Sequence, residues 1–259
     1  YLITAATAQL HDRDWLIDHL PVGSPITIED LTETMSTLIV TGPTSRDVLG
    51  GLCGADLAQP WLSHQESEIA GQWVRLLRVS FAGELGWEVH ALTDGMPKVY
   101  EAVLGAGAKP FGMFALDSLR MEKGYRTWKG DLSTDYTLFQ AGLGRFVRLN
   151  KAQDFPGKTA LMNEQQQGST RAFATMVLQA NGHDAPYMSN VWKGDEHVGE
   201  TTSGGWGYRV DASIALGIVR PDCAEPGTEL EVEIFGERVK AVVQHDQPLW
   251  DPENQRLRA

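Results

Sequence analysis

Glu88 is the residue whose type and position most suggest chemistry, because it lies in the alternating stretch Trp87 to Leu92. In a β-strand this alternation puts the apolar side chains on one face and the polar pair, Glu88 and His90, on the other. A carboxylate accepts two parallel N–H bonds, the arrangement that guanidinium groups and planar heterocycles such as pterins present. On the residues alone, Glu88 is either a surface carboxylate or, if its face borders a pocket, the group that binds such a ring.

A second candidate is the run from Ser203 to Tyr208, which reads Ser-Gly-Gly-Trp-Gly-Tyr. Three glycines allow the backbone to come close to a ligand, and the side chains of Trp206 and Tyr208 offer flat faces for stacking. The same residues also fit a strand that is kinked by glycine and packs its aromatic side chains into the core. Both interpretations stay open at this point.

The common phosphate-binding, metal-binding and nucleophile motifs do not occur in the sequence. Gly142-Leu143-Gly144 begins like a dinucleotide-binding fingerprint, but it lacks the third glycine and the preceding strand. The dipeptide His-Asp begins at His11, His183 and His245, in three unlike contexts. We therefore predict that these pairs lie on the surface by chance and that the chain has no metal site.

Composition narrows the class of protein further. Of the 259 residues, 42% are hydrophobic and 22% charged, as in a globular domain, and the net charge of −12 argues against nucleic acid as a partner. No apolar run reaches the roughly 18 residues of a membrane span, and the first residues lack a signal-peptide pattern. We expect a soluble, cytoplasmic protein that does not bind membranes.

Two further features concern the cysteines and the first residue. Cys53 and Cys223 lie far apart in no metal-binding or disulfide pattern, so we predict two buried thiols. The chain starts at Tyr1 rather than Met, already in a strand-like run, and we interpret it as part of a longer protein.

The elements that must position the candidate residues form two groups. Up to residue 168, hydrophobic periodicity and turn signals predict helices over 12–20, 46–52, 96–104, 113–123 and 158–167, and strands over 26–31, 37–41, 73–80 and 87–92. The last two strands are expected to form a hairpin through 81–86. The irregular stretch 125–144 is long enough to favour a ligand-lining loop.

Beyond residue 168 the pattern changes to short strands and turns. We predict strands over 172–178, 189–192, 198–203, 214–219, 230–235 and 239–244, with Gly236-Glu237 as a two-residue hairpin turn. The predicted fold class is therefore α+β: an antiparallel sheet with helices, followed by a small C-terminal β-barrel or jelly roll. The predicted domains are 1–168 and 169–259.

Four motifs, in order and spacing, resemble the folate-binding aminomethyltransferase family, whose founding member is the glycine-cleavage T-protein. They are Phe81 to Glu88, Leu116 to Gly124, Ala141 to Gly144 and Thr202 to Gly205. The details, including the ending Leu249 to Arg258, are most similar to the C-terminal folate region of dimethylglycine and sarcosine dehydrogenase-like flavin oxidoreductases. The resemblance covers nearly the whole chain.

This resemblance implies an activity. The chain would be the tetrahydrofolate-binding, one-carbon transfer portion of an FAD-dependent N-methylamine dehydrogenase. In such enzymes a flavin domain oxidises the amine to an iminium, and tetrahydrofolate takes up the one-carbon unit as 5,10-methylenetetrahydrofolate. FAD is expected only in an N-terminal domain of the same chain, which the given sequence lacks. The family's catalytic aspartate is expected upstream of Tyr1, so we expect this segment alone to be inactive.

The resemblance also implies roles for single residues. Glu88 matches the glutamate that holds the pterin. Phe81 falls where the T-protein has a tyrosine near the folate. A phenylalanine there can still stack on the folate, but it cannot make the hydrogen bond of a tyrosine hydroxyl. Arg145 falls where the T-protein has a tryptophan and would contact the anionic folate tail. Trp206 and Tyr208 complete the predicted cofactor-binding set. The Gly-rich segment 203–207 is expected to form a loop that closes over the folate site.

Helix 113–123 departs from the T-protein pattern at one position. Leu116 falls where the T-protein has an arginine, as it does in the dehydrogenase branch. Arg120 has a structural interpretation, a helical (i, i+3) pair with Asp117.

Two other functions stay open. One is a folate-binding homologue without transfer activity, such as the iron–sulfur-assembly relatives of the T-protein. Those relatives carry a Lys-Gly-Cys-Tyr-x-Gly-Gln-Glu motif, whereas residues 123–126 here read Lys-Gly-Tyr-Arg, which argues against that branch. The other is an interaction module of the same shape whose pocket is empty.

Overall fold

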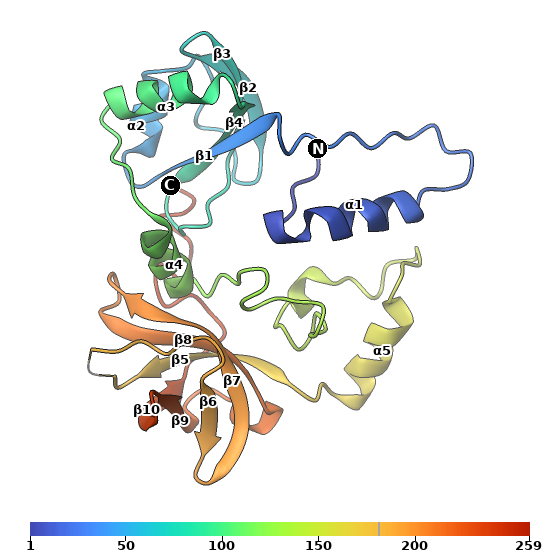
Figure 1. The fold of residues 1–259 in the computed structure, drawn as a ribbon, viewed down its shortest axis with the longest axis vertical. Coiled ribbons are helices and arrows are strands. Elements are labelled where there is room, and N and C mark those ends of the chain that lie inside the picture. The colour runs from blue at the N-terminus through green and yellow to red at the C-terminus, as the bar shows by residue number, and fades with distance from the viewer. Residues whose placement is uncertain (181) are drawn as a thin grey trace. The chain divides into compact units, whose positions relative to one another are not determined.

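The computed structural model describes residues 1–180 and 182–259, which form two compact units. The first unit comprises residues 1–113 together with 253–259, and the second comprises residues 114–252. Figure 1 colours the ribbon along the chain and labels the elements of each unit. The domain division at residue 168 that the sequence suggests stays a prediction.

The first unit is built on a four-stranded antiparallel sheet in the order β1-β4-β3-β2. Its strands are β1 (Met35–Thr41), β2 (His64–Ile69), β3 (Gln72–Leu77) and β4 (Gly86–Leu92). Its helices are η1 (Ala6–Ala8), α1 (Gln9–Asp18), α2 (Ser45–Gly50) and α3 (Met96–Gly105). Figure 1 shows α2 and α3 beside the sheet and α1 apart from it, and no residue of α1 is buried.

The core of this unit confirms the alternation predicted for β4. Trp87, Val89 and Ala91 are fully buried on the face that packs with the apolar side of β3 and with α2 and α3. The helices contribute Leu49 and Val99, also fully buried. The opposite face of β4 therefore carries the even-numbered polar residues.

Two expectations for this unit need correction. Residues 26–31 form no strand; they are mostly exposed coil. The hairpin of β3 and β4 is confirmed, but β3 ends at Leu77, so the connection runs over residues 78–85. Strand β2 was not predicted, because its sequence His-Gln-Glu-Ser-Glu-Ile is polar at an exposed edge of the sheet.

The second unit contains a closed six-stranded antiparallel barrel, which confirms the predicted fold class. The strand order is β10-β5-β8-β7-β6-β9. The strands are β5 (Ala172–Leu178), β6 (Asn190–Lys193), β7 (Glu196–Gly207), β8 (Ala212–Val219), β9 (Glu229–Ile234) and β10 (Glu237–Val243). The helices are α4 (Met113–Glu122), whose first residue belongs to the first unit, η2 (Gly144–Phe146), α5 (Lys158–Gln167) and η3 (Pro221–Cys223).

The turn between β9 and β10 lies one residue earlier than predicted. Ile234 pairs with Glu237, so the turn residues are Phe235 and Gly236, with φ of 51° and 87°. A two-residue hairpin turn with positive φ at both positions matches the right-handed twist of the strands. The prediction failed because glycine was assigned to the first turn position, whereas an exposed phenylalanine occupies it.

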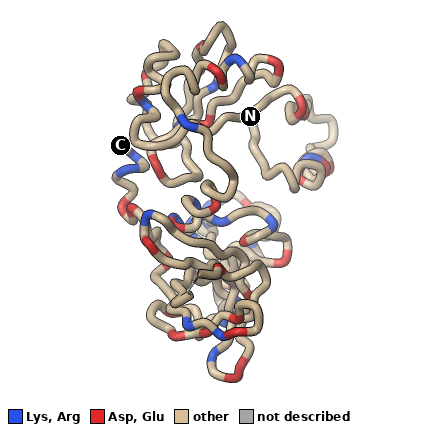
Figure 2. Tube along the Cα trace, turned by 60° about the vertical axis from the view of Figure 1, so that its left-hand side comes forward, with Lys and Arg blue, Asp and Glu red and all other residues tan. Residues whose placement is uncertain are grey.

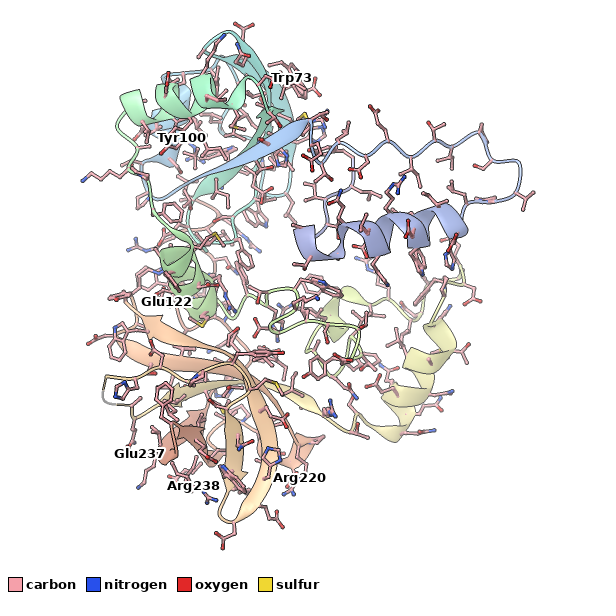
Figure 3. All side chains as sticks on the ribbon, in the orientation of Figure 1. Trp73, Tyr100, Glu122, Arg220, Glu237 and Arg238 are labelled. Atoms are coloured by element: carbon pink, nitrogen blue, oxygen red, sulfur yellow. The ribbon has the colours of Figure 1, made fainter. Side chains whose placement is uncertain are left out.

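A buried ion pair joins α4 to the barrel within the second unit. Glu122, labelled in Figure 3, is fully buried and accepts a hydrogen bond of 2.6 Å from the main-chain N–H of Arg209. The guanidinium of Arg209 also bonds this carboxylate and donates to the carbonyl of Leu119 at 2.8 Å. A buried carboxylate is tolerated because these donors replace water.

The cysteines, the lengths of the helices and the distribution of charge can also be compared with the expectations from sequence. Cys223 is fully buried as predicted, but Cys53 is only half-buried, and its thiol lies 3.2 Å from the carbonyl of Leu49. None of the helices in the described residues is long and apolar enough to cross a membrane. Lys and Arg are interspersed with Asp and Glu along the trace of each unit (Figure 2).

Candidate functional site

Glu88 lies in the middle of the sheet of the first unit. Strand β4 is flanked on both sides, so Glu88 stands opposite Ile39 of β1 and Leu77 of β3. About one-quarter (24%) of its side chain is exposed, although its strand neighbours on either side are fully buried. The sheet thus fixes the backbone of Glu88 and leaves its carboxylate accessible from one face.

The carboxylate of Glu88 has one side-chain partner in the described part of the chain. Its Oε2 lies 3.2 Å from Nε2 of His90, which is 2% exposed. Within residues 1–180 and 182–259, Oε1 has no hydrogen-bond partner. An incoming N–H donor can therefore bond Oε1 without displacing a protein group.

A cavity of about 480 Å³ opens on the same face of the sheet. Its lining includes Tyr1 and also Arg75 and Leu77, which pair with His90 and Glu88 across β3 and β4. Glu88 and His90 themselves are not among the lining residues. The guanidinium of Arg75 donates to the carboxylate of Glu66 at 3.0 Å and lies 4.8 Å from the ring centroid of Tyr1. The guanidinium of Arg75 is therefore paired with Glu66 and not with Glu88. The carboxylate of Glu88 can still accept a hydrogen bond from another donor.

Phe81 is half-buried in the connection 78–85 that leads into β4. The same connection contains Arg78, which is 1% exposed, lies 4.6 Å from the ring centroid of Trp87 and donates to the main-chain oxygen of Ala259 at 2.9 Å. Burial lowers the pKa of Arg78, and the nearby positive charge of Arg46 lowers it further. Phe81 and Glu88 thus lie on adjoining segments of one unit, as predicted for a hairpin.

Trp206 and Tyr208 lie together in the second unit. Both line a cavity of about 670 Å³ between α4, the segment 184–187 and the end of β7. Trp206 is half-buried and Tyr208 is 80% exposed, so neither ring enters the barrel core. Of the two interpretations of this run, the kinked strand is right about the backbone and wrong about the aromatic side chains.

The predicted Gly-rich loop is wrong, because residues 203–207 are the last part of strand β7. A Cβ atom at Gly204 would collide with the carbonyl oxygen of Ala185, and one at Gly205 would collide with the end of the Met121 side chain. The glycines therefore permit close packing of the segment 184–187 and of α4 on β7. They are explained by packing within the protein, without a ligand.

Three residues that line this cavity bond a buried carboxylate that no sequence motif marks. Asp131 is fully buried and accepts hydrogen bonds from Arg120 at 2.7 Å, from Thr202 at 2.5 Å and from Ser203 at 2.8 Å. The predicted pair of Arg120 with Asp117 is confirmed at 3.2 Å, but the contact of Arg120 with Asp131 is shorter and fully buried. Asp131 ties the irregular stretch after α4 to β7.

Arg145 lies in η2 and is exposed, with its guanidinium 5.0 Å from the ring centroid of Phe146. It is not part of the lining of the cavity with Trp206 and Tyr208. Nearby Arg126 is largely buried, bonds Asp246 at 3.2 Å, and has a pKa that is lowered mainly by burial. Of these two arginines, Arg145 is the exposed one, so an anionic group in solution can reach it.

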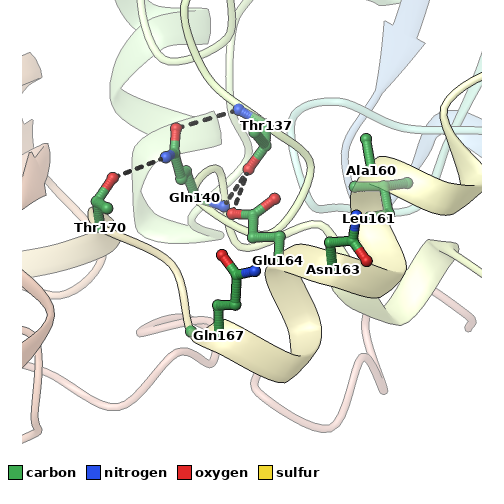
Figure 4. Close-up of a pocket in the computed structure, with 9 residues that line it drawn as sticks. Thr137, Gln140, Ala160, Leu161, Asn163, Glu164, Gln167 and Thr170 are labelled. Carbon is green, nitrogen blue, oxygen red and sulfur yellow. Dashed lines mark hydrogen bonds between the residues drawn. The ribbon is translucent and has the colours of Figure 1, made fainter.

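Figure 4 shows another cavity of the second unit, of about 360 Å³, beside α5. Its polar groups bond one another: Glu164 accepts from Thr137 at 2.8 Å, and Gln140 donates to Thr170 at 3.3 Å. It contains none of the predicted site residues. In the described residues no group of three or more His, Cys, Asp or Glu is arranged to hold a metal ion.

Comparison with known protein families gives two matches that together span most of the chain. Residues 1–151 match the model described as "GCVT N-terminal domain", and residues 171–251 match "Glycine cleavage T-protein C-terminal barrel domain". A solved structure, the glycine cleavage system aminomethyltransferase T from Bartonella henselae, superposes with a TM-score of 0.76 at 25% identity, over 84% of this chain and 60% of that one.

Curated proteins of two kinds are similar in sequence. The mitochondrial dimethylglycine dehydrogenase of Homo sapiens is 32% identical over 99% of this chain, which corresponds to 31% of that protein. The mitochondrial sarcosine dehydrogenase of Mus musculus is 33% identical over 88% of this chain and 26% of that protein. The aminomethyltransferase of Synechococcus elongatus is 34% identical over 94% of this chain and 65% of that protein. The chain thus spans about a third of the length of the dehydrogenases.

Proposed function

The chain belongs to the folate-binding glycine-cleavage T-protein family, and on this premise we propose that it is the tetrahydrofolate-binding, one-carbon transfer portion of an FAD-dependent N-methylamine dehydrogenase. The match to dimethylglycine dehydrogenase over 99% of this chain supports this proposal, and the aminomethyltransferase of Synechococcus elongatus matches 94% of the chain at a similar identity. The flavin would belong to a further domain of the same protein.

The observation that carries the proposal is the state of the Glu88 carboxylate. It stands on a central strand, is partly exposed, and has Oε1 without a partner in the described residues. A pterin ring presents two neighbouring N–H groups on one edge, which a carboxylate can accept in parallel. The residues present therefore fit a folate ring at this face of the sheet.

The other predicted contacts extend this proposal. Phe81, on the segment that leads into β4, would stack its phenyl face on the ring. It would make no hydrogen bond through its side chain, because phenylalanine has no hydroxyl. Arg145 would bind the carboxylates of the folate tail by a charge-assisted contact, since it is exposed. Trp206 and Tyr208 line the cavity of the second unit, and their part in cofactor binding stays a prediction from the sequence.

Bound tetrahydrofolate would supply the N5 atom that takes up a one-carbon unit from an N-methyl amine. The protein's part would be to bind and orient the ring, so that the reacting atoms meet at high effective concentration. A cytoplasmic location and a flavin domain as intramolecular partner remain predictions from the sequence.

Calorimetric titration of the 259-residue chain with 5-formyltetrahydrofolate tests the proposal. We expect saturable binding at one site per chain. Binding that is abolished when the pterin is removed from the ligand would support recognition through the ring. If the chain binds p-aminobenzoylglutamate as tightly as the whole folate, the pterin is not recognised and the proposal for Glu88 fails.

A further inference from the structure

His90 is a buried imidazole to which the proposed function assigns no role. It lies two residues after Glu88 on the same face of β4 and is 2% exposed. A neutral imidazole has one N–H donor and one acceptor nitrogen, and a buried ring needs a partner for each. The two ring nitrogens of His90 meet partners of different kinds.

These partners determine where the proton is. Nε2 lies 3.2 Å from Oε2 of Glu88, whereas Nδ1 lies 3.0 Å from the hydroxyl of Tyr1 and 3.2 Å from that of Thr37. An ionised carboxylate only accepts, but a hydroxyl can also donate. The proton therefore belongs on Nε2, and the opposite tautomer would turn the lone pair of Nε2 toward the carboxylate.

The neighbouring cation does not compete for this role. Arg75 faces His90 across the pair β3 and β4, but its guanidinium bonds Glu66 and lies over the ring of Tyr1. In the described part of the chain, His90 is the group that holds the side chain of Glu88. The hydroxyls of Tyr1 and Thr37 in turn hold the imidazole.

We propose that His90 is a positioning residue, whose Nε2–H fixes Oε2 of Glu88 and so aims the carboxylate at a bound pterin ring. This inference rests on the proposed function, because it gives Glu88 a ligand. A long flexible carboxylate loses rotamer freedom when it binds a ring, and a donor that fixes it beforehand removes part of that loss.

The affinity for 5-formyltetrahydrofolate tests the proposal in the 259-residue chain with five variants. His90→Leu removes the donor, and we expect affinity to fall about three- to tenfold, as for one lost hydrogen bond. His90→Gln keeps an N–H donor and should stay within about twofold of the original affinity. Thr37→Val is the matched control, because it removes the longer of two hydroxyl contacts to Nδ1, while the hydroxyl of Tyr1 still holds the ring and Nε2 keeps its contact with Glu88.

The last two variants, Glu88→Gln alone and Glu88→Gln combined with His90→Leu, separate positioning from a general structural role. In a Glu88→Gln background, His90→Leu should lower the affinity by no more than about twofold, because its effect passes through the carboxylate. An equal loss in both backgrounds, or a loss in Thr37→Val as large as in His90→Leu, would overturn the proposal. If Glu88→Gln weakens binding while His90→Leu does not, the positioning role fails and the proposed function stands. If neither substitution matters, or the original chain does not bind, the proposed function fails as well.

A second measurement needs neither folate nor a variant. Long-range 1H–15N NMR correlations of the His90 ring distinguish the two neutral tautomers in the folded chain. We expect the Nε2–H form, and a ring that is protonated on Nδ1 alone would overturn the proposal. This result stays decisive if His90→Leu does not fold.

Discussion

Replacing Glu88 with glutamine should weaken the binding of reduced folate by about 1.5–2 kcal/mol, or roughly ten- to thirtyfold. The full range for a hydrogen bond to a charged group is about 1.5–3 kcal/mol, with about 1.4 kcal/mol for each factor of ten. The lower part of that range applies because 24% of the side chain is exposed, so solvent screens the charge. Glutamine also has one acceptor oxygen, for which His90 and the pterin ring would compete.

The assay is calorimetric titration with 5-formyltetrahydrofolate at constant salt. Glu101→Gln is the matched control, because it makes the same change of charge at an exposed position of α3, the helix on the buried side of the sheet. A folate analogue without the 2-amino group extends the test. Its affinity should depend less on Glu88, because one of the two N–H donors is missing.

Two results would refute this reasoning. The first is a Glu88→Gln variant that binds as tightly as the original chain. The second is an equal loss in Glu101→Gln, which would show that net charge rather than a local bond controls affinity. Thermal unfolding of each variant shows whether the sheet is intact, so that a lost site is not confused with a lost fold.

Three further predictions concern the rest of the molecule. Asp131→Asn should destabilise the chain by about 3–5 kcal/mol, because it leaves the buried guanidinium of Arg120 without its main counter-charge. Urea unfolding measures this change, and a loss under about 1 kcal/mol would show that the hydrogen bonds around Asp131 contribute little to stability. Phe235→Asn should stabilise the turn by a few tenths of a kcal/mol to about 1 kcal/mol, because asparagine tolerates positive φ better; a lower thermal midpoint would contradict the turn geometry. Arg145→Glu should weaken the binding of folate with a glutamate tail severalfold. The difference in affinity between this variant and the original chain should shrink as the salt concentration rises, because salt screens the charge. A loss of affinity that does not change with salt would exclude a charge contact.

The polar face of β4 could be predicted from sequence because strand periodicity is a local property. Alternation from Trp87 to Leu92 was enough to put Glu88 and His90 on one face, and the structure confirms it. The barrel strands beyond residue 168 were predictable for the same reason. Strand β2 was not, because an exposed edge strand needs no apolar side chains.

The Gly-rich run shows why a local pattern can mislead about function. Glycine permits close approach of any group, and the sequence alone does not say whether that group is a ligand or protein. At Gly204 the group is the backbone of Ala185, which lies in a segment nineteen residues earlier in the chain. Packing, not ligand binding, explains the residue.

Asp131 could not be found from sequence, because its partners are distant along the chain. Thr202 and Ser203 reach it from β7, and Arg120 reaches it from α4. A single aspartate in an irregular stretch has no periodicity or motif to mark it. The bond between His90 and Glu88 was within reach, since both residues share a face, but alternation does not indicate which side chains bond.

The most direct test of the account is a crystal structure of this chain with 5-formyltetrahydrofolate. The account predicts that the ring's N3 and 2-amino groups lie within about 2.7–3.2 Å of the Glu88 carboxylate, while His90 keeps its bond to Oε2. A ring bound away from β4, with the Glu88 carboxylate in contact only with His90, would contradict it.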